Sequence, residues 1–355
     1  MIAQVFMQTK NIYKRDSIFI GDYLKSACTV SYSRNVFLPI TNLCRNHCAY
    51  CGFRRDPDDG AWFMPPGDVI EVTKRAKVAG CSEALLTLGE RPDVHAEARE
   101  KLDALGYESM VDYTEDLCRQ ILELGLLPHT NAGLLSEREI RRLRRYNASM
   151  GLMLECVTDL PAHRNSPGKA PRRRLKVIEV AGKLRIPFTT GLLIGIGEKF
   201  EDRVRSLFAI RKLHERYGHI QEVIIQPFDP KPGTPMENRP RPSESELFAT
   251  VAVARSIMPD MNIQVPPNLV SNVSPLLLAG ANDLGGISPV TPDFINPEQP
   301  WPSVAELRAE IKRAGFTPRE RLPIYPRYVK DERFMSEEVR EHVYELADEE
   351  GYRAC

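Results

Sequence analysis

The sequence lacks the features of a membrane, secreted or nucleic-acid-binding protein. No apolar run approaches the roughly 18 residues of a membrane-spanning helix, so we expect no membrane association. The first residues, MIAQVFMQTKNIYKRD, have neither an apolar core nor a small-residue cleavage site, so we expect no secretory signal and a cytoplasmic location. The 48 Lys and Arg residues balance 48 Asp and Glu residues, so no net charge attracts nucleic acid.

Disulfide bonds are not expected either, because the cytosol keeps thiols reduced. The chain nevertheless has eight cysteines, and three of them crowd into the segment CRNHCAYC. The others are scattered: Cys28, Cys81, Cys118, Cys156 and Cys355. The crowding of three thiols is the first indication of function.

A recurring pattern predicts the fold. An amphipathic helix, a glycine and a short apolar strand follow one another, as in DVIEVTKRAKVAG and CSEALLTLGE. Near-continuous apolar strands are typical of parallel strands covered by helices. We therefore predict an α/β protein with a TIM-type (β/α) barrel, and a doubly wound open sheet is the alternative. The expected strands lie at 34–40, 84–88, 126–130, 149–155, 187–194, 221–226 and 262–266, with a short eighth near 284–288.

The expected barrel spans residues 34–317, with an N-terminal extension over 1–33 and a C-terminal helical extension over 318–355. Two proline-rich stretches, 227–242 and 288–302, cannot be regular helix or central strand. Stiff loops of this kind often serve as lids in barrel enzymes. We interpret the basic clusters 141–145 and 172–174 as solvated helix faces.

The spacing C-x3-C-x2-C places Cys44, Cys48 and Cys51 directly after a predicted strand. Three thiolates can hold a 4Fe–4S cluster and leave one iron without a protein ligand. A zinc site is the main alternative, but structural zinc sites usually use four ligands in two separated pairs, and no second C-x2-C occurs. Three unrelated buried thiols are the remaining alternative.

Here the sequence resembles the radical SAM superfamily. The triad has an aromatic residue before its last cysteine, and three further segments agree with the superfamily: LTLGERP, GLMLE and GLLIGIGE. The first differs at Leu88, which replaces a glycine of the superfamily pattern. The resemblance implies S-adenosylmethionine (SAM) as cosubstrate, cleaved with an electron from the cluster to methionine and a 5′-deoxyadenosyl radical. It also implies the cofactor-binding residues Tyr50, Gly89, Glu90, Glu155, Gly191, Gly195 and Glu198.

Within the superfamily, the segment from about Tyr32 to Pro302 resembles the 7,8-didemethyl-8-hydroxy-5-deazariboflavin (FO) synthase family, cofG subunit. NDLGGISPVTPDFINPEQPWP carries most of this likeness. The resemblance implies that a cofH subunit supplies 5-amino-5-(4-hydroxybenzyl)-6-(D-ribitylimino)-5,6-dihydrouracil. The cofG enzyme then closes the third ring, releases ammonia as a lyase, and needs an electron donor.

Such a substrate is neutral and rich in hydrogen-bonding groups. We expect its contacts among neutral and acidic side chains at the strand ends: His129, Asn131, Asn282, Asp283 and Ser288. Loop caps and turns are the competing roles for these residues. A cofH-type or menaquinone-pathway radical SAM enzyme, and a zinc- or cluster-bearing binding module, are the alternatives for the whole chain.

Overall fold

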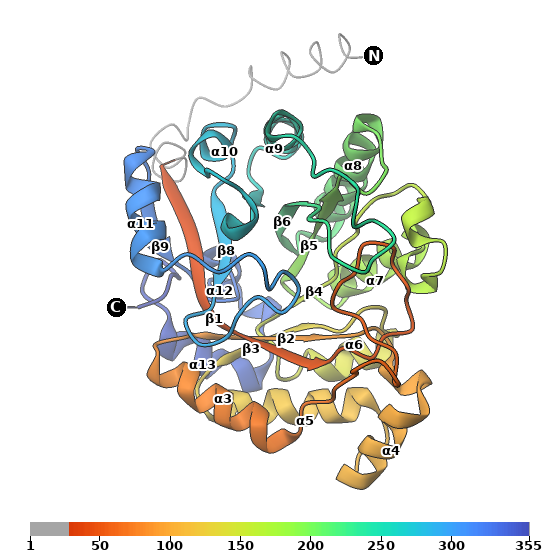
Figure 1. Ribbon diagram of the computed structural model, residues 1–355. Helices are drawn as coiled ribbons and strands as arrows, with labels where there is room; N and C mark the ends of the chain where they lie inside the picture. Colours follow the sequence, from red (N-terminus) through yellow and green to blue (C-terminus); the bar gives the residue numbers. More distant parts are fainter. Residues whose placement is uncertain (1–27, 355) are drawn as a thin grey trace.

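The computed structural model describes residues 28–354, so the expectations for residues 1–27 and for Cys355 lie outside the described residues. Eight parallel strands form a closed barrel in the order β2-β3-β4-β5-β6-β7-β8-β1, and β1 pairs with β2 to close the ring (Figure 1). The predicted TIM-type barrel is confirmed, and the doubly wound alternative is wrong. The strands are β1 (Thr29–Thr41), β2 (Glu83–Leu88), β3 (Leu127–Asn131), β4 (Ser149–Gly151), β5 (Phe188–Ile194), β6 (Ile220–Pro227), β7 (Asn262–Gln264) and β8 (Asp283–Ile287).

Helices cover the outside of the barrel (Figure 1). Serines begin several of them: the side chains of Ser136, Ser243 and Ser303 each accept a backbone hydrogen bond in a capping box. The helices are α3 (Pro66–Val78), α4 (Ala96–Leu105), α5 (Met110–Glu123), α6 (Glu137–Leu143), α7 (Pro171–Lys183), α8 (Phe200–Tyr217), α9 (Glu244–Ile257), α10 (Ser274–Leu278), α11 (Val304–Arg313), α12 (Pro326–Val329) and α13 (Glu337–Leu346). Short 3-10 helices are η1 (Pro92–Val94), η2 (Pro161–His163), η3 (Pro167–Lys169), η4 (Pro267–Leu269) and η5 (Glu332–Phe334).

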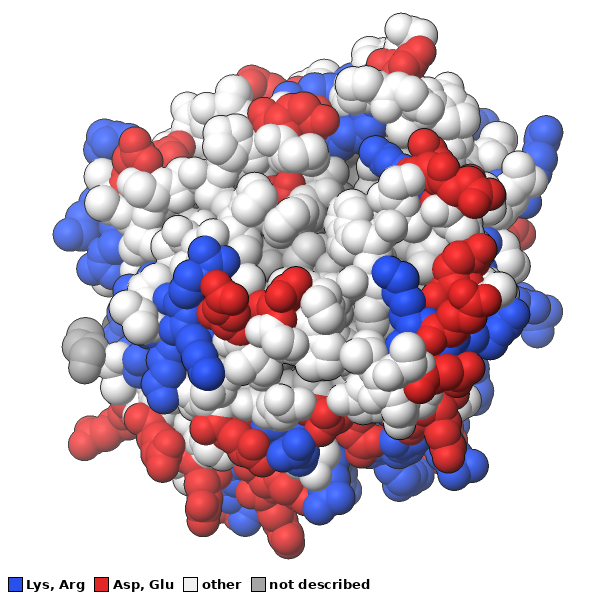
Figure 2. Space-filling view, turned by 60° about the horizontal axis from the view of Figure 1, so that its bottom comes forward, with Lys and Arg blue, Asp and Glu red and all other residues white. Residues whose placement is uncertain are grey.

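The surface carries no dominant charge. Figure 2 shows one face, on which acidic and basic side chains are interspersed, as the balanced composition leads one to expect. No helix in residues 28–354 is long and apolar enough to cross a membrane.

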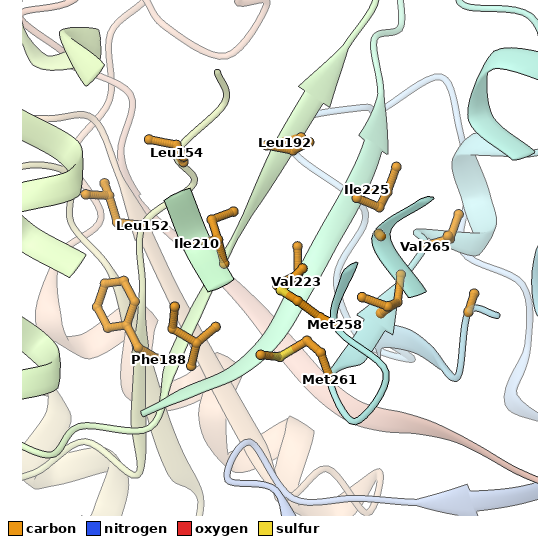
Figure 3. Packing of buried hydrophobic residues seen from close by; sticks show 14 of the residues in the cluster. Leu152, Leu154, Phe188, Leu192, Ile210, Val223, Ile225, Met258, Met261 and Val265 are labelled. Atoms are coloured by element: carbon orange, nitrogen blue, oxygen red, sulfur yellow. The ribbon is translucent and has the colours of Figure 1, made fainter. Parts of the chain in front are cut away.

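The largest apolar cluster packs the outer face of the strands against the helices. Phe188 on β5, Val223 and Ile225 on β6, and Ile210 on α8 all belong to it and are almost fully buried (Figure 3). Because side chains alternate along a strand, the residue between the two on β6, Ile224, lies on the opposite face, inside the barrel. This alternation separates the structural core from the lumen.

The chain after α11 adds a strand and closes one end of the barrel. β9 (Thr317–Glu320) pairs with β1 outside the ring, with Thr29 opposite Thr317. The expected barrel begins at residue 34, which lies inside β1. The expected C-terminal extension begins at residue 318, which lies inside β9. The segment after β9 buries Leu322, Ile324 and Tyr325 against the N-terminal ends of the strands.

Candidate active site

The cysteine loop lies at the C-terminal ends of the strands, where barrel enzymes place their reactive groups. The amide of His47 donates to the carbonyl of Asn165 at 3.0 Å, and that of Ala49 donates to Ala162 at 2.9 Å. The loop after β6 also joins it, since the Met236 amide donates to the Ala49 carbonyl at 3.2 Å. Three connections far apart in the sequence thus meet at one end of the barrel, near α7 in Figure 1.

The three thiols are free and surrounded by hydrogen-bond donors. Cys44 Sγ accepts from the amides of Glu90 at 3.2 Å and Asn46 at 3.4 Å, and Cys48 Sγ accepts from Ser166 Oγ at 3.3 Å. Cys51 Sγ accepts from the amide of Arg54 at 3.5 Å. Hydrogen bonds of this kind stabilise and tune iron–sulfur ligands.

The thiol environment fits a cluster better than one ion. Burial raises the pKa of Cys44 to about 11 and also raises that of Cys51, so binding a metal group must release protons. Within residues 28–354, no three His, Cys, Asp or Glu side chains converge closely enough to hold a single metal ion. Thiolates that bind different iron atoms of a cluster need not converge in that way.

Gly89 brings the end of β2 against the cysteine loop. A Cβ at this position would lie 1.8 Å from the Leu43 carbonyl oxygen and 2.8 Å from Cys44 Cβ, so no other residue fits without movement. The next residue, Glu90, is buried; its Oε1 accepts from Arg45 Nε at 2.8 Å and its Oε2 from the Leu134 amide at 3.0 Å. The loop glycine Gly168 packs directly on this carboxylate.

Glu155 follows β4 in a left-handed conformation, with φ of 64°. Its backbone forms a bridge to Leu192 of β5, which holds the residue in that conformation. Burial opposes ionisation, but the nearby charges of Lys169 and Arg174 lower the pKa of this carboxyl. Lys169 Nζ lies 2.5 Å from its Oε1, and Arg174 lies 3.9 Å from Glu155 and 3.8 Å from Glu90. One arginine therefore lies between the two candidate cofactor-binding carboxylates.

The glycine motif at the end of β5 contacts the neighbouring strand β6 and its own loop. A Cβ at Gly191 would lie 2.2 Å from the Ile224 carbonyl oxygen, so glycine allows β5 and β6 to approach. Gly195 has φ of 96°, and its amide donates to Glu198 Oε1 at 2.8 Å. Glu198 also pairs with Arg203 at 2.7 Å, and so it shapes the loop at the end of β5.

Tyr50 lies at the same end of the barrel. Its hydroxyl and His163 Nε2 are 3.0 Å apart, and Lys169 Nζ lies 5.9 Å from its ring centroid. Burial and the negative charge of Glu155 raise the pKa of Tyr50 well above its usual value, so it stays protonated. The ring thus connects the cysteine loop to the segment that carries Lys169.

The five expected substrate residues are not brought together. A Cβ at Gly151 would lie 2.3 Å from Asn131 Oδ1 and 2.9 Å from His129 Nε2, so these two side chains are neighbours on one side of the barrel. Ser288 instead closes a turn, because its Oγ accepts from the Thr291 amide at 3.0 Å.

Asn282 and Asp283 lie at the wrong end. Asp283 is the first residue of β8 and accepts from Ser31 near the start of β1, whereas Cys44 follows the end of β1. The expectation that both residues lie at the barrel mouth is therefore wrong. The segment after the seventh strand returns through α10 to the opposite end before β8 begins.

Sequence reasoning also missed Lys169, Arg174 and His163. Arg174 was interpreted as part of a solvated helix face, but it is only 4% exposed, and its guanidinium donates to the Gly168 carbonyl at 3.0 Å. The segment NSPGKAP (165–171) lies within the range of the family likeness and contains Lys169, so it offered a signal for that residue but not for Arg174 or His163. A run of three arginines does not reveal which one faces inward.

Comparisons with known proteins identify relatives of the chain. The radical SAM superfamily model matches residues 38–210. A protein of Methanopyrus kandleri named 7,8-didemethyl-8-hydroxy-5-deazariboflavin synthase is 52% identical over 332 residues, covering 91% of this chain and 99% of its own. A protein of the same name from Archaeoglobus fulgidus is 52% identical over 325 residues, covering 91% and 98%.

Solved structures share the fold at low sequence identity. The FeFe-hydrogenase maturase HydG from Carboxydothermus hydrogenoformans superposes with a TM-score of 0.68 at 18% identity, covering 99% of this chain and 87% of its own. Methylornithine synthase (PylB) gives 0.64 at 19% identity, covering 87% and 92%. These likenesses support the barrel architecture alone.

Proposed function

The chain belongs to the radical SAM superfamily and, within it, to the family of 7,8-didemethyl-8-hydroxy-5-deazariboflavin synthases, and from this premise we propose that it closes the deazaflavin ring system. It is an enzyme of FO synthesis. The substrate that we propose is 5-amino-5-(4-hydroxybenzyl)-6-(D-ribitylimino)-5,6-dihydrouracil, and the products are FO, ammonia, methionine and 5′-deoxyadenosine. The 52% identity over nearly the full length of a curated synthase is the observation that carries this proposal.

Cys44, Cys48 and Cys51 would hold the 4Fe–4S cluster. When bound, the cluster supplies the electron that cleaves SAM, and the chemistry belongs to these cofactors. The chain supplies position: backbone amides and Ser166 donate to the thiols, and Gly89 fixes β2 against their loop.

SAM carries an ammonium and a ribose diol, and the site offers a buried carboxylate for each. We propose Glu90 for the ammonium and Glu155 for the ribose, with Tyr50, Gly89, Gly191, Gly195 and Glu198 shaping the surrounding pocket. Lys169 and Arg174 lower the pKa of Glu155, and Arg174 also lies 3.8 Å from Glu90 and so helps to position both carboxylates. The buried Arg174 would be a costly unpaired charge without them.

Water and competing hydrogens must be kept from a reactive primary radical. Lys231 joins three connections at the barrel mouth: its Nζ donates to Asp229 at 2.6 Å and to Glu298 at 2.9 Å, and its stem packs 3.0 Å from the position of a Cβ on Gly52. Both proline-rich loops are therefore fixed to the cysteine loop, which suits their expected role as lids.

The decisive experiment is an anaerobic assay of the iron–sulfide-reconstituted protein with SAM, a reductant and either of two substrate sets. Deazaflavin fluorescence from the hydroxybenzyl adduct alone supports the cofG-type reaction. Consumption of tyrosine with 5-amino-6-ribitylaminouracil, without deazaflavin, would indicate the cofH-type reaction. A protein that binds zinc but not iron would contradict both. We further propose a cytoplasmic location, a cofH partner that supplies the adduct, and a separate electron donor.

A further inference from the structure

A cavity of about 180 Å³ lies inside the barrel beneath the loop that follows β8. Strands contribute to it through the inward-facing positions of the alternation: Asn35 and Phe37 on β1, and Ile224 and Gln226 on β6. Trp301, from the proline-rich loop, also lines it. None of these residues was predicted from the sequence as part of a site.

Three residues that line this cavity each have a buried polar atom without a hydrogen-bond partner: Asn35 Oδ1, Asn268 Oδ1 and Trp301 Nε1. Asn35 is only 2% exposed. Buried polar groups are nearly always paired in folded proteins, and leaving one unpaired costs about 1–3 kcal/mol. Two unpaired acceptors and one unpaired donor on residues of the same cavity therefore suit a ligand that offers both donors and acceptors.

Two glycines leave space for the amides. A Cβ at Gly286 would lie 2.1 Å from Asn35 Nδ2, and a Cβ at Gly285 would lie 2.3 Å from Gln264 Nε2. The Gly-Gly pair of β8 thus lets two amide side chains occupy the lumen. This gives a physical reason for glycine in a strand that otherwise gains from larger residues.

The lining suits a neutral ligand. Among the described residues no Lys, Arg or His lines the cavity. The carboxylate of Asp293 is already engaged: it accepts from the amides of Ile295 and Asn296, and from Asn268 Nδ2 at 3.0 Å. The Asn268 amide nitrogen is therefore engaged, and its oxygen is the group left unpaired. Phosphate or carboxylate ligands would find no positive partner here.

We propose that this cavity binds the dihydrouracil ring of the substrate, a neutral cyclic ureide with N–H and carbonyl groups on its edge. Asn35 and Asn268 accept from the ring N–H groups, and Trp301 donates to a carbonyl. The apolar residues Phe37 and Ile224 contact the face of the ring. This assignment rests on the proposed function, and it gives the amide-rich lumen a role in substrate specificity.

Two variants test it in the reconstituted holoenzyme: Trp301→Phe, which removes the indole donor and keeps an aromatic ring, and Asn35→Leu. The probe is FO, titrated by its fluorescence, together with KM for the adduct. We expect a raised KM for the adduct in each variant, and about tenfold weaker FO binding in Trp301→Phe, because FO keeps the ring carbonyls but only one ring N–H; iron content and SAM affinity should be unchanged. Trp62→Phe is the matched control, because the Trp62 indole donates to the Pro39 carbonyl and lies outside the cavity.

A second probe is a deazaflavin with a methyl group in place of the ribityl group. It distinguishes binding of the ring from binding of the ribityl group. Loss of affinity for both probes supports the ring assignment. Loss of affinity for FO alone would show that the cavity binds the ribityl group instead of the ring. If the wild type makes FO and both variants bind FO normally, the assignment of this cavity to the ring is wrong, and the proposed function stands. Loss of iron in both variants also overturns the ring assignment, because the residues are then structural. A wild type that makes no FO overturns both.

Discussion

Arg321 holds Asp283 at the closed end of the barrel, with its Nε 2.7 Å from Oδ2 and a terminal nitrogen 3.1 Å from Oδ1. Both side chains are buried, and Arg321 also lies 3.3 Å from Glu222. The arginine comes from the segment after β9, and the two acids come from the starts of β8 and β6. The interaction therefore fastens the C-terminal segment to the end of the barrel that is remote from the cysteines.

Asp283→Ala should accordingly destabilise the fold instead of blocking substrate binding. Removing one partner of a buried ion pair costs about 3–5 kcal/mol, because the other charge is left uncompensated. Denaturant unfolding of the cluster-free protein measures the loss. Glu137→Ala is the control: it removes an exposed pair with Arg141, and we expect a change below about 0.5 kcal/mol. A stable Asp283 variant that binds SAM but makes no FO would restore the substrate role.

The sequence predicted the barrel because its signal is local. Apolar strands recur at each unit and glycines follow several of the helices, and the predicted strand at 187–194 nearly coincides with β5, Phe188–Ile194. The motif TPRE of β9 is polar and short, and its pairing with β1 depends on residues nearly three hundred positions away. No local pattern could reveal it.

A local sequence pattern also does not show at which end of the barrel a residue lies. Asp283 and Ser288 lie close together in sequence, yet β8 carries them to opposite ends of the barrel. The role of Arg174 depends on Glu90 and Glu155, which come from different loops. Sequence spacing could single out the cysteines as candidate ligands because the pattern lies within one loop, whereas these ion pairs depend on the assembled fold.

The cysteine triad gives the next prediction. Cys44→Ala, Cys48→Ala and Cys51→Ala should each abolish cluster assembly and SAM cleavage, because three thiolates are required. Iron and sulfide content after anaerobic reconstitution, with the visible absorption of the cluster, provide the measurement. Cys28→Ala and Cys118→Ala are controls, one exposed and one buried, and should keep normal iron content. A control cysteine as necessary as the triad would show that the ligand assignment is wrong.

Glu90→Gln and Glu155→Gln should weaken SAM binding while leaving the iron content normal. A charge-assisted hydrogen bond to an ammonium or diol contributes about 1.5–3 kcal/mol, which is at least tenfold in affinity. Equilibrium binding of labelled SAM to the reconstituted protein measures this. Glu201→Gln changes an exposed glutamate on α8 and should have no effect. Wild-type SAM affinity in both variants would leave Glu90 and Glu155 as structural partners of Arg174.

His129 should make stability depend on pH. It is buried, its Nδ1 lies 2.6 Å from Ser149 Oγ, and burial followed by the nearby Arg321 charge lowers its pKa to about 3. The unfolded chain, with a histidine pKa near 6.5, therefore takes up the proton first as the pH falls. The contribution to stability is complete above about pH 6.5 and is lost as the pH falls toward 3.

Between pH 6.5 and pH 5 the loss from this one histidine should be about 2 kcal/mol. Denaturant unfolding of wild type and His129→Gln at several pH values isolates the contribution of His129. Burial also lowers the pKa of His219 to about 3, but His219 contributes equally to both proteins. The variant should lose less stability on acidification, and its lower stability at pH 7 does not affect that comparison. His47→Gln, at an exposed position in the cysteine loop, should keep the wild-type slope. Identical slopes for wild type and His129→Gln would mean that His129 takes up a proton in the folded barrel as readily as in the unfolded chain, which would contradict its lowered pKa.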